Sequence, residues 1–386
     1  MTKKLNFTYV IPVLVSFFVM SFCDLVGIGV DRVKLEFGIS NTLVQLIPSA
    51  VFVWFFILSV PVGILQDRIG KRNMVNIGMG ITAIGLFIPF FFYTFTMVLF
   101  GFALLGIGNT IVQVSANPLL VDVVPSNRRS SFLSFSQFIK AIGSMIAAPL
   151  AGFFALKFGD WKILFIVFGV ISMLSVLWLS MIRIEETKNL EKRATFGSSF
   201  GLLGTRFIFM MVLGIFLVVG IDVGINAVSG QFLLSKFHAP QTFCESGRSV
   251  YFFGKMLGTF GGALMLTILP SRKFFLWSSI LALCSILALI FAPSAMSSMV
   301  IIFIIGLGTS NIFPLIFSLS VEKYPVRTNE ISGLMIMAVS GGAVIPLLIG
   351  TLTDNIGITA GMFVLVVCAG YEILTALINL KKAPVK

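Results

Sequence analysis

Long apolar blocks recur along the whole chain and constrain its fold more than any other feature. Many are close to twenty residues long, which is the length that a helix needs to cross roughly 30 Å of hydrocarbon at about 1.5 Å per residue. Only 11% of the 386 residues are charged and 58% are hydrophobic, whereas soluble domains carry about 25% charged residues. So few charges cannot cover a soluble surface, and the sequence predicts a polytopic membrane protein.

We expect an all-α membrane protein, because backbone groups in lipid must be satisfied within each segment and the blocks do not alternate as membrane strands would. Twelve transmembrane helices are predicted, over residues 8–30, 43–65, 73–93, 96–122, 130–156, 162–183, 207–235, 247–268, 273–293, 297–321, 329–353 and 358–380.

The basic residues indicate the topology. The chain has 27 Lys and Arg against 15 Asp and Glu, an excess that could indicate a nucleic-acid partner. If the N-terminus is cytoplasmic, however, 19 of the 27 lie on the cytoplasmic side, from Lys3 and Lys4 through the 183–206 segment to the tail Lys381, Lys382 and Lys386. This asymmetry follows the positive-inside rule. We therefore expect both termini in the cytoplasm, the lipid bilayer as the surroundings and no nucleic-acid partner.

The residues before the first helix, the cysteines and the single histidine argue against a secreted protein and against an enzyme. Lys3 and Lys4 could begin a secretory signal, but no convincing cleavage site follows, so we expect a retained first helix. The four cysteines are scattered and offer neither a disulfide framework nor a metal-ligand spacing. With His238 as the single histidine, and with no nucleotide-binding loop, we expect no enzyme, no metal and no organic cofactor.

An internal repeat divides the chain. GIGNTIVQVSANPLLVDVVP begins at Gly106 and GLGTSNIFPLIFSLSVEKYP begins at Gly306, and both open with Gly-x-Gly and end with Pro. Asp24 and Asp222 are separated by nearly the same interval. Parallel halves of this kind characterise one class of secondary transporters. We predict an N-terminal six-helix bundle (1–183), a cytoplasmic linker (184–206) and a C-terminal six-helix bundle (207–386), related by pseudo-symmetry.

The segment GILQDRIGKR, residues 63–72, resembles the signature of the major facilitator superfamily between its second and third helices. Gly63 would allow close helix approach, while Asp67 and the basic residues would cross-link helices at the cytoplasmic face. The resemblance implies a cytoplasmic gate, which we expect to include Arg128 and Arg129 of the next cytoplasmic loop near Asp67 and Arg68. The predicted gate residues are Gly63, Asp67, Arg68, Gly70, Lys71, Arg72 and Arg128.

Four further segments resemble the fucose/glucose–galactose sugar symporter branch of this superfamily. They are SANPLL (115–120), GKMLG (254–258), FPLIFSL (313–319) and SGLMIMAVSGGAVIPLLIGTLTD (332–354). The branch implies the major facilitator fold, a central cavity lined chiefly by helices 1, 4, 7 and 10, alternating access, and coupling to protons or to sodium.

Charged residues inside predicted spans are costly and usually face a protein interior or water. Asp24, Lys140, Asp222 and Lys255 lie well inside theirs. The purely structural alternative is two buried salt bridges, Asp24–Lys140 and Asp222–Lys255. Buried pairs give little net stability relative to apolar replacements, so we expect Asp24 and Asp222 to couple cation binding to transport.

The resemblance separates these residues. Asp222 and Lys255 fall at positions where the branch carries an acid in helix 7 and a basic residue in helix 8, whereas Asp24 has no such counterpart. Gln113 falls where the fucose type carries its proton-binding glutamate, and a glutamine cannot titrate. Lys140 lies near a position that is neutral in the fucose type, which keeps an acidic sugar open as the substrate.

Amide side chains near the same depth can donate to and accept from sugar hydroxyls, or bond one helix to another. Together with the two lysines they form the predicted substrate site: Gln113, Asn117, Gln137, Lys140, Asn226, Lys255 and Asn311. Gln113 and Asn117 are four residues apart and share a helix face.

We expect uptake of a small hydrophilic substrate, a sugar or sugar derivative, coupled to a proton or sodium ion in the plasma membrane, with a bacterial inner membrane favoured and a monomer as the working unit. The alternatives are an exporter of drugs or metabolites on the same fold, a carrier of an acidic sugar or organic anion, and a sensor or scaffold that does not transport.

Overall fold

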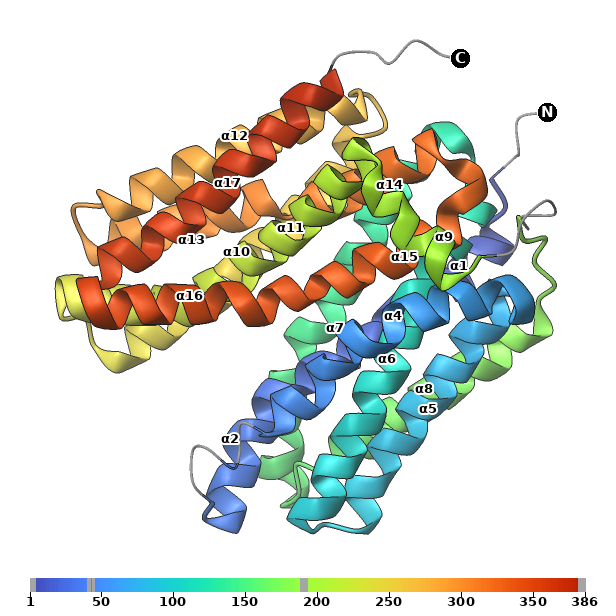
Figure 1. Ribbon diagram of the computed structural model, residues 1–386. Coiled ribbons are helices and arrows are strands. Elements are labelled where there is room, and N and C mark those ends of the chain that lie inside the picture. The colour runs from blue at the N-terminus through green and yellow to red at the C-terminus, as the bar shows by residue number, and fades with distance from the viewer. Residues whose placement is uncertain (1–4, 40–42, 44–45, 188–193, 381–386) are drawn as a thin grey trace. The chain divides into compact units, whose positions relative to one another are not determined.

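The computed structural model describes residues 5–39, 43, 46–187 and 194–380 (Figure 1). Lys3, Lys4 and the tail Lys381, Lys382 and Lys386 lie outside these described residues. Every regular element in the described part is helical, as predicted. The α-helices are α1 (Phe7–Met20), α2 (Val26–Phe37), α4 (Leu46–Ile69), α5 (Lys71–Phe91), α6 (Phe95–Val123), α7 (Arg129–Phe158), α8 (Ile163–Met181), α9 (Phe196–Gly201), α10 (Arg206–Phe237), α11 (Gln241–Met265), α12 (Ser271–Ile290), α13 (Ala295–Thr309), α14 (Ile312–Lys323), α15 (Thr328–Met337), α16 (Gly341–Ile356) and α17 (Ile358–Leu380).

Eleven helical segments in the described residues are long and apolar enough to cross a membrane. The remaining predicted span, 247–268, is α11, which is less apolar because it carries Arg248 and Lys255. Large apolar side chains on the spans are exposed, among them Leu156 at 91% and Met181 at 81%. A soluble protein rarely leaves so much apolar surface uncovered, and exposure of this kind is typical of a membrane protein.

The chain forms two compact units. Unit 1 comprises Met1–Arg129, Ile139–Gly201 and Tyr324–Met337, and unit 2 comprises Ser130–Phe138, Leu202–Lys323 and Ala338–Lys386. Within unit 1, α5 packs against α6 and α8; within unit 2, α12 packs against α13 and α17 in the corresponding way (Figure 1). The repeat seen in the sequence is thus a repeat of helix packing. The predicted division at 184–206 stays a prediction.

The paired Gly-x-Gly sequences explain why the two packings match. A Cβ on Gly106 would lie 2.4 Å from the Val51 carbonyl oxygen of α4, and one on Gly306 would lie 2.4 Å from the Tyr251 carbonyl oxygen of α11. Gly108 and Gly308 approach α5 and α12 as closely. Only glycine lets these helix backbones touch, so the motif packs helices rather than binding a ligand.

Three spans are irregular where the site residues lie. A 3₁₀ segment, Ser21–Leu25, follows α1 and contains Asp24; α13 ends at Thr309, just before Asn311; and a second 3₁₀ segment, Ala338–Ser340, separates α15 from α16. Such interruptions free backbone carbonyls, which must find other partners inside a membrane protein.

Candidate functional site

The ion pair between Asp222 and Lys255 lies in unit 2. Asp222 projects from α10, and its carboxylate accepts hydrogen bonds from the Lys255 ammonium and the Tyr251 hydroxyl of α11. The side chains of Lys255 and Asp222 are 27% and 19% exposed. The charges are therefore paired but still accessible, which a transport role requires and a purely structural pair does not.

Tyr251 was not predicted as a site residue. Its ring is fully buried, and its hydroxyl lies 3.0 Å from the Thr309 hydroxyl at the end of α13. It thus links the acid on α10 to the helix break near Asn311. The sequence signal was available, because Tyr251 is four residues before Lys255 and shares its helix face.

The two predicted amides of unit 2 have different surroundings. Asn226 lies one turn beyond Asp222 and donates to its backbone carbonyl at 2.7 Å, while its own amide oxygen has no hydrogen-bond partner in the described residues. Asn311 is buried, donates to the Gly258 carbonyl oxygen at 2.7 Å, and occupies the space that a Cβ on Gly262 would fill. Asn311 therefore joins α11 to the helix break. Its amide oxygen also has no partner in the described residues, but its side chain is buried whereas Asn226 is partly exposed.

In unit 1 three amide side chains of α6, the predicted Gln113 and Asn117 together with Asn109, form a chain. Asn109 donates to the Met20 carbonyl oxygen at 2.5 Å, just before the 3₁₀ segment, and Gln113 donates to the Asn109 side chain at 2.7 Å. Asn117 donates to the Gln113 backbone, and its amide oxygen has no partner among the described residues. The chain fixes the irregular part of the first span to α6.

The alternative salt bridge between Asp24 and Lys140 is not formed in the described residues. Asp24 is exposed and instead accepts a hydrogen bond from the Ser144 hydroxyl of α7. Lys140, one turn earlier on α7, is partly exposed and has no acidic partner in the described part of the chain. The physical reason is the 3₁₀ segment, which sets the direction of Asp24 and cannot be read from an ideal helix. Gln137, also on α7, is partly buried.

The end of α4 packs directly on the beginning of α15, both within unit 1. A Cβ on Gly63 would lie 2.9 Å from the Asn329 carbonyl oxygen, and one on Gly333 would lie 2.9 Å from the Ser59 carbonyl oxygen. The prediction that Gly63 permits close approach is confirmed. The two helices come from opposite halves of the sequence.

Asp67 has partners that the sequence did not predict. Its carboxylate accepts hydrogen bonds from the Asn329 side chain and, at 3.0 Å, from the Ala194 backbone amide of the linker. Arg68 and Arg128 are exposed, and neither hydrogen-bonds to Asp67 in the described residues. The printed sequence did not indicate this bond between α4 and α15, because Asn329 is distant in the chain.

The remaining signature residues fix the linker. Gly70 has φ +92° and turns the chain into α5. The backbone amides of Lys71 and Arg72 donate to the Glu186 carboxylate at 2.6 and 2.9 Å, where the positive end of the helix dipole also favours an acid. The Arg72 guanidinium donates to the Ile182 carbonyl oxygen.

Lys71 forms a buried salt bridge that sequence reasoning missed. Its ammonium lies 2.6 Å from the Asp122 carboxylate at the end of α6, and the two side chains are only 2% and 4% exposed. It also donates to the Thr187 carbonyl oxygen at 3.2 Å. Asp122 lies at the edge of a predicted span, where an acid passes for an interfacial residue. The signature therefore joins α4, α5, α6, α15 and the linker.

We expect Asp67→Asn to weaken the contact between α4 and α15. Hydrogen bonds to a charged group contribute about 1.5–3 kcal/mol, which corresponds to a population change of roughly tenfold to a hundredfold. Single-turnover transport should slow while ligand affinity changes little, and a cysteine placed at Ser59 should label faster. Arg68→Gln is the matched control, because Arg68 is exposed next to Asp67. Unchanged turnover in Asp67→Asn would contradict the prediction that Asp67 is a gate residue.

No three His, Cys, Asp or Glu side chains converge as metal ligands in the described residues. The polar side chains of the site form an ion pair and hydrogen bonds between apolar helices. Long apolar helices that carry a charged pair within them define a multi-pass membrane protein.

The chain belongs to the Major Facilitator Superfamily, whose family model matches residues 12–345. This confirms the resemblance carried by GILQDRIGKR. The chain is 27% identical to the glucose/galactose transporter of Brucella abortus, over 91% of this chain and 89% of that protein. It is also 27% identical to the putative glucose/galactose transporter of Helicobacter pylori, over 89% and 88% of the two chains.

A solved structure shares the fold. The crystal structure of the E. coli fucose:proton symporter FucP superposes with a TM-score of 0.84 at 19% identity, covering 97% of this chain and all of that one. The likeness confirms the major facilitator fold.

Proposed function

We propose that this chain takes up a sugar or sugar derivative together with a cation by alternating access. The observation that carries the proposal is the partly exposed Asp222–Lys255 pair, hydrogen-bonded to Tyr251 within membrane helices. Ionisable residues inside a membrane span usually belong to a functional site. The names of the curated relatives, which match over most of both chains, support a sugar as the substrate.

The coupling ion we propose is a proton. Asp222 can take up a proton and release Lys255, so the ion pair can open and close as the substrate binds. Asp24, exposed beside Ser144, is the second candidate for cation coupling. A plasma-membrane location, with a bacterial inner membrane favoured, cytoplasmic termini and a monomeric unit complete the proposal.

Purified protein in proteoliposomes tests this directly. We expect counterflow of radiolabelled glucose, galactose or fucose, and accumulation of the same sugar when an inward proton gradient is imposed. Protein-free liposomes supply the background, and a sodium gradient at equal pH separates the two ions. Efflux of lipophilic cations with no sugar counterflow would contradict the proposal and favour the exporter. Sugar binding without counterflow would favour the sensor.

A second candidate substrate is an acidic sugar. Lys140 is partly exposed without an acidic partner in the described residues, and Lys255 can exchange Asp222 for a substrate carboxylate. Arg or Lys beside a hydrogen-bonding site is the usual way to bind a carboxylate. A hexuronate added to the counterflow assay distinguishes the two classes, because a neutral-sugar carrier would ignore it.

A further inference from the structure

An acidic residue that the proposed mechanism does not use lies inside unit 2. Glu372 is in the middle of the last helix, α17, and its side chain is fully buried. Its carboxyl group faces α10 at Gly214 and lies beside Ile316 of α14: a Cβ on Gly214 would lie 3.4 Å from Glu372 Oε2 and 3.0 Å from the Ile316 side chain. Glycine at 214 therefore leaves the room that the carboxyl group occupies.

Neither carboxyl oxygen of Glu372 has a hydrogen-bond partner in the described residues, and the same holds for the hydroxyl of the buried Thr375. An ionised carboxylate without a partner is strongly disfavoured inside a membrane protein. Glu372 therefore holds a proton in this arrangement of the helices.

The titratable groups on α17 and on the helices next to Glu372 are distributed along those helices. Cys368 and Tyr371 are its titratable neighbours on α17. Those on α14 and on the helices packed against α17 are Arg206, Asp222 and Lys236 of α10, Arg272, Lys273 and Cys284 of α12, Glu322 and Lys323 of α14, and Asp354 of α16. None of them hydrogen-bonds to Glu372 in the described part of unit 2.

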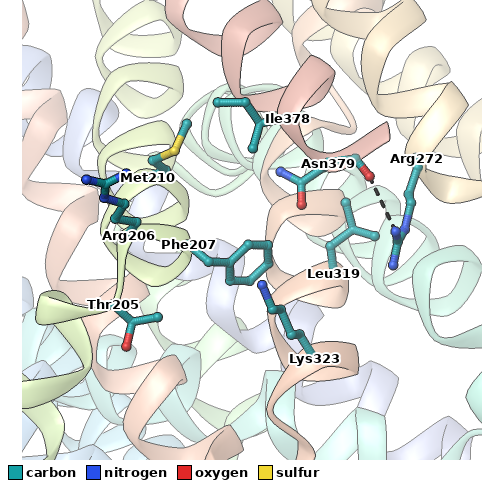
Figure 2. A pocket seen from close by; sticks show the side chains of 9 residues that line it. All are labelled: Thr205, Arg206, Phe207, Met210, Arg272, Leu319, Lys323, Ile378 and Asn379. Atoms are coloured by element: carbon teal, nitrogen blue, oxygen red, sulfur yellow. Dashed lines mark hydrogen bonds between the residues drawn. The ribbon is translucent and has the colours of Figure 1, made fainter. Parts of the chain in front are cut away.

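A pocket of about 520 Å³ opens at the end of the same helices (Figure 2). Three basic side chains, Arg206, Arg272 and Lys323, line it. Arg272 donates to the Asn379 carbonyl oxygen at 3.4 Å, and the Lys323 ammonium lies 3.8 Å from the centre of the Phe207 ring. The pocket is therefore both positively charged and partly apolar.

The pocket wall on α10 is one helical turn from Gly214, the glycine that Glu372 faces. Met210 lines the pocket and is four residues before Gly214, which is about 6 Å along a helix. The Tyr371 hydroxyl donates to the Met210 carbonyl oxygen at 3.2 Å, and the Asn379 side chain donates to the Thr375 carbonyl oxygen at 2.7 Å. Polar groups of α10 and α17 therefore lie between the pocket and the depth of Glu372.

We infer that Glu372 is a proton-binding residue of the transport cycle, which exchanges its proton through the pocket lined by Arg206, Arg272 and Lys323. This inference rests on the proposed transport function. On release, the O–H bond of the Glu372 carboxyl breaks, its electron pair stays on the carboxylate and the proton passes to water in the pocket. The basic lining of the pocket, in which Arg272 also lies 3.7 Å from the Glu322 carboxylate, favours the negative charge that remains. Uptake is the reverse, and Asp222 acts separately through Lys255.

Glu372→Gln is the first test, because glutamine keeps the shape of the protonated acid and cannot ionise. In proteoliposomes we expect this variant to keep sugar counterflow but to lose sugar-driven proton flux and its pH dependence. Asp354→Asn, an exposed acid on α16, is the matched control and should behave as wild type. Wild-type proton flux in Glu372→Gln would overturn the inference, whereas absence of counterflow in the wild type would overturn the proposed function instead.

Infrared difference spectroscopy of the purified protein tests the proton site without transport. A protonated-carboxyl band should shift in D₂O, be absent in Glu372→Gln and move in Glu372→Asp, which covers the case that the glutamine variant does not fold. Leu319→Trp, which fills the pocket wall, should slow the D₂O shift. The assigned route would be overturned if the carboxyl band never shifts in D₂O. It would also be overturned if Leu319→Trp leaves the rate of that shift unchanged.

Discussion

Asp222→Asn is expected to abolish cation-driven accumulation of substrate while leaving counterflow intact. The variant keeps the volume of the side chain and can still accept a hydrogen bond from Tyr251, but it can no longer pair ionically with Lys255 or take up a proton. Counterflow requires only that the loaded carrier reorients, so it should continue. The measurement is uptake by proteoliposomes with and without a proton gradient, at equal protein density.

Two further variants sharpen this prediction. Tyr251→Phe removes one of the two hydrogen bonds to the carboxylate and should give an intermediate loss of accumulation. Lys255→Met should selectively lose acidic substrates if the ammonium binds a substrate carboxylate. Normal transport by both Asp222→Asn and Lys255→Met would show that the pair only holds α10 to α11.

Lys71→Met is expected to cause the largest loss of stability. It leaves the Asp122 carboxylate buried without its partner cation, and breaking a buried pair from one side costs about 3–5 kcal/mol. Asp122 would keep the hydrogen bond from the Thr187 amide at 3.2 Å, which does not replace the ammonium charge. The detergent-solubilised variant should therefore unfold at a clearly lower temperature than wild type.

The double variant Lys71→Met/Asp122→Leu should recover most of that loss, because apolar replacement of a complete buried pair is often neutral or stabilising. Arg68→Met is the control, since it removes an exposed charge from the same signature. A double variant as unstable as the single one would show that the linker contacts, and not the unpaired charge, carry the effect.

Some of the contacts considered from the sequence are present in the structure and others are not. Asp222 and Lys255 are paired as the alternative reading required, and Gly63 makes the predicted close approach. Asp24 and Lys140 do not pair in the described residues, because a 3₁₀ segment turns Asp24 towards Ser144. Their roles in transport stay predictions.

The missed acids lie at different depths of their predicted spans. Asp122 lies at the end of the 96–122 span, where an acid reads as part of the polar interface, whereas Glu372 lies in the middle of the 358–380 span. Burial of a side chain at such a depth depends on which neighbouring helix covers it, and hydropathy records only the average along the chain. Tyr251 was missed for a different reason: its spacing places it on the same helix face as Lys255, but 13% of the residues are aromatic and many of them share a face with a polar residue.

The sequence by itself determined the class of the protein, the approximate limits of its helices and the repeat that relates its halves. It could do so because lipid admits only segments that satisfy their own backbone and are apolar over a fixed length. Only the tertiary structure decided which partner each buried polar group has. That choice depends on helix rotation and close approach, set by glycines such as Gly63, Gly106 and Gly306 together with neighbours from distant parts of the chain.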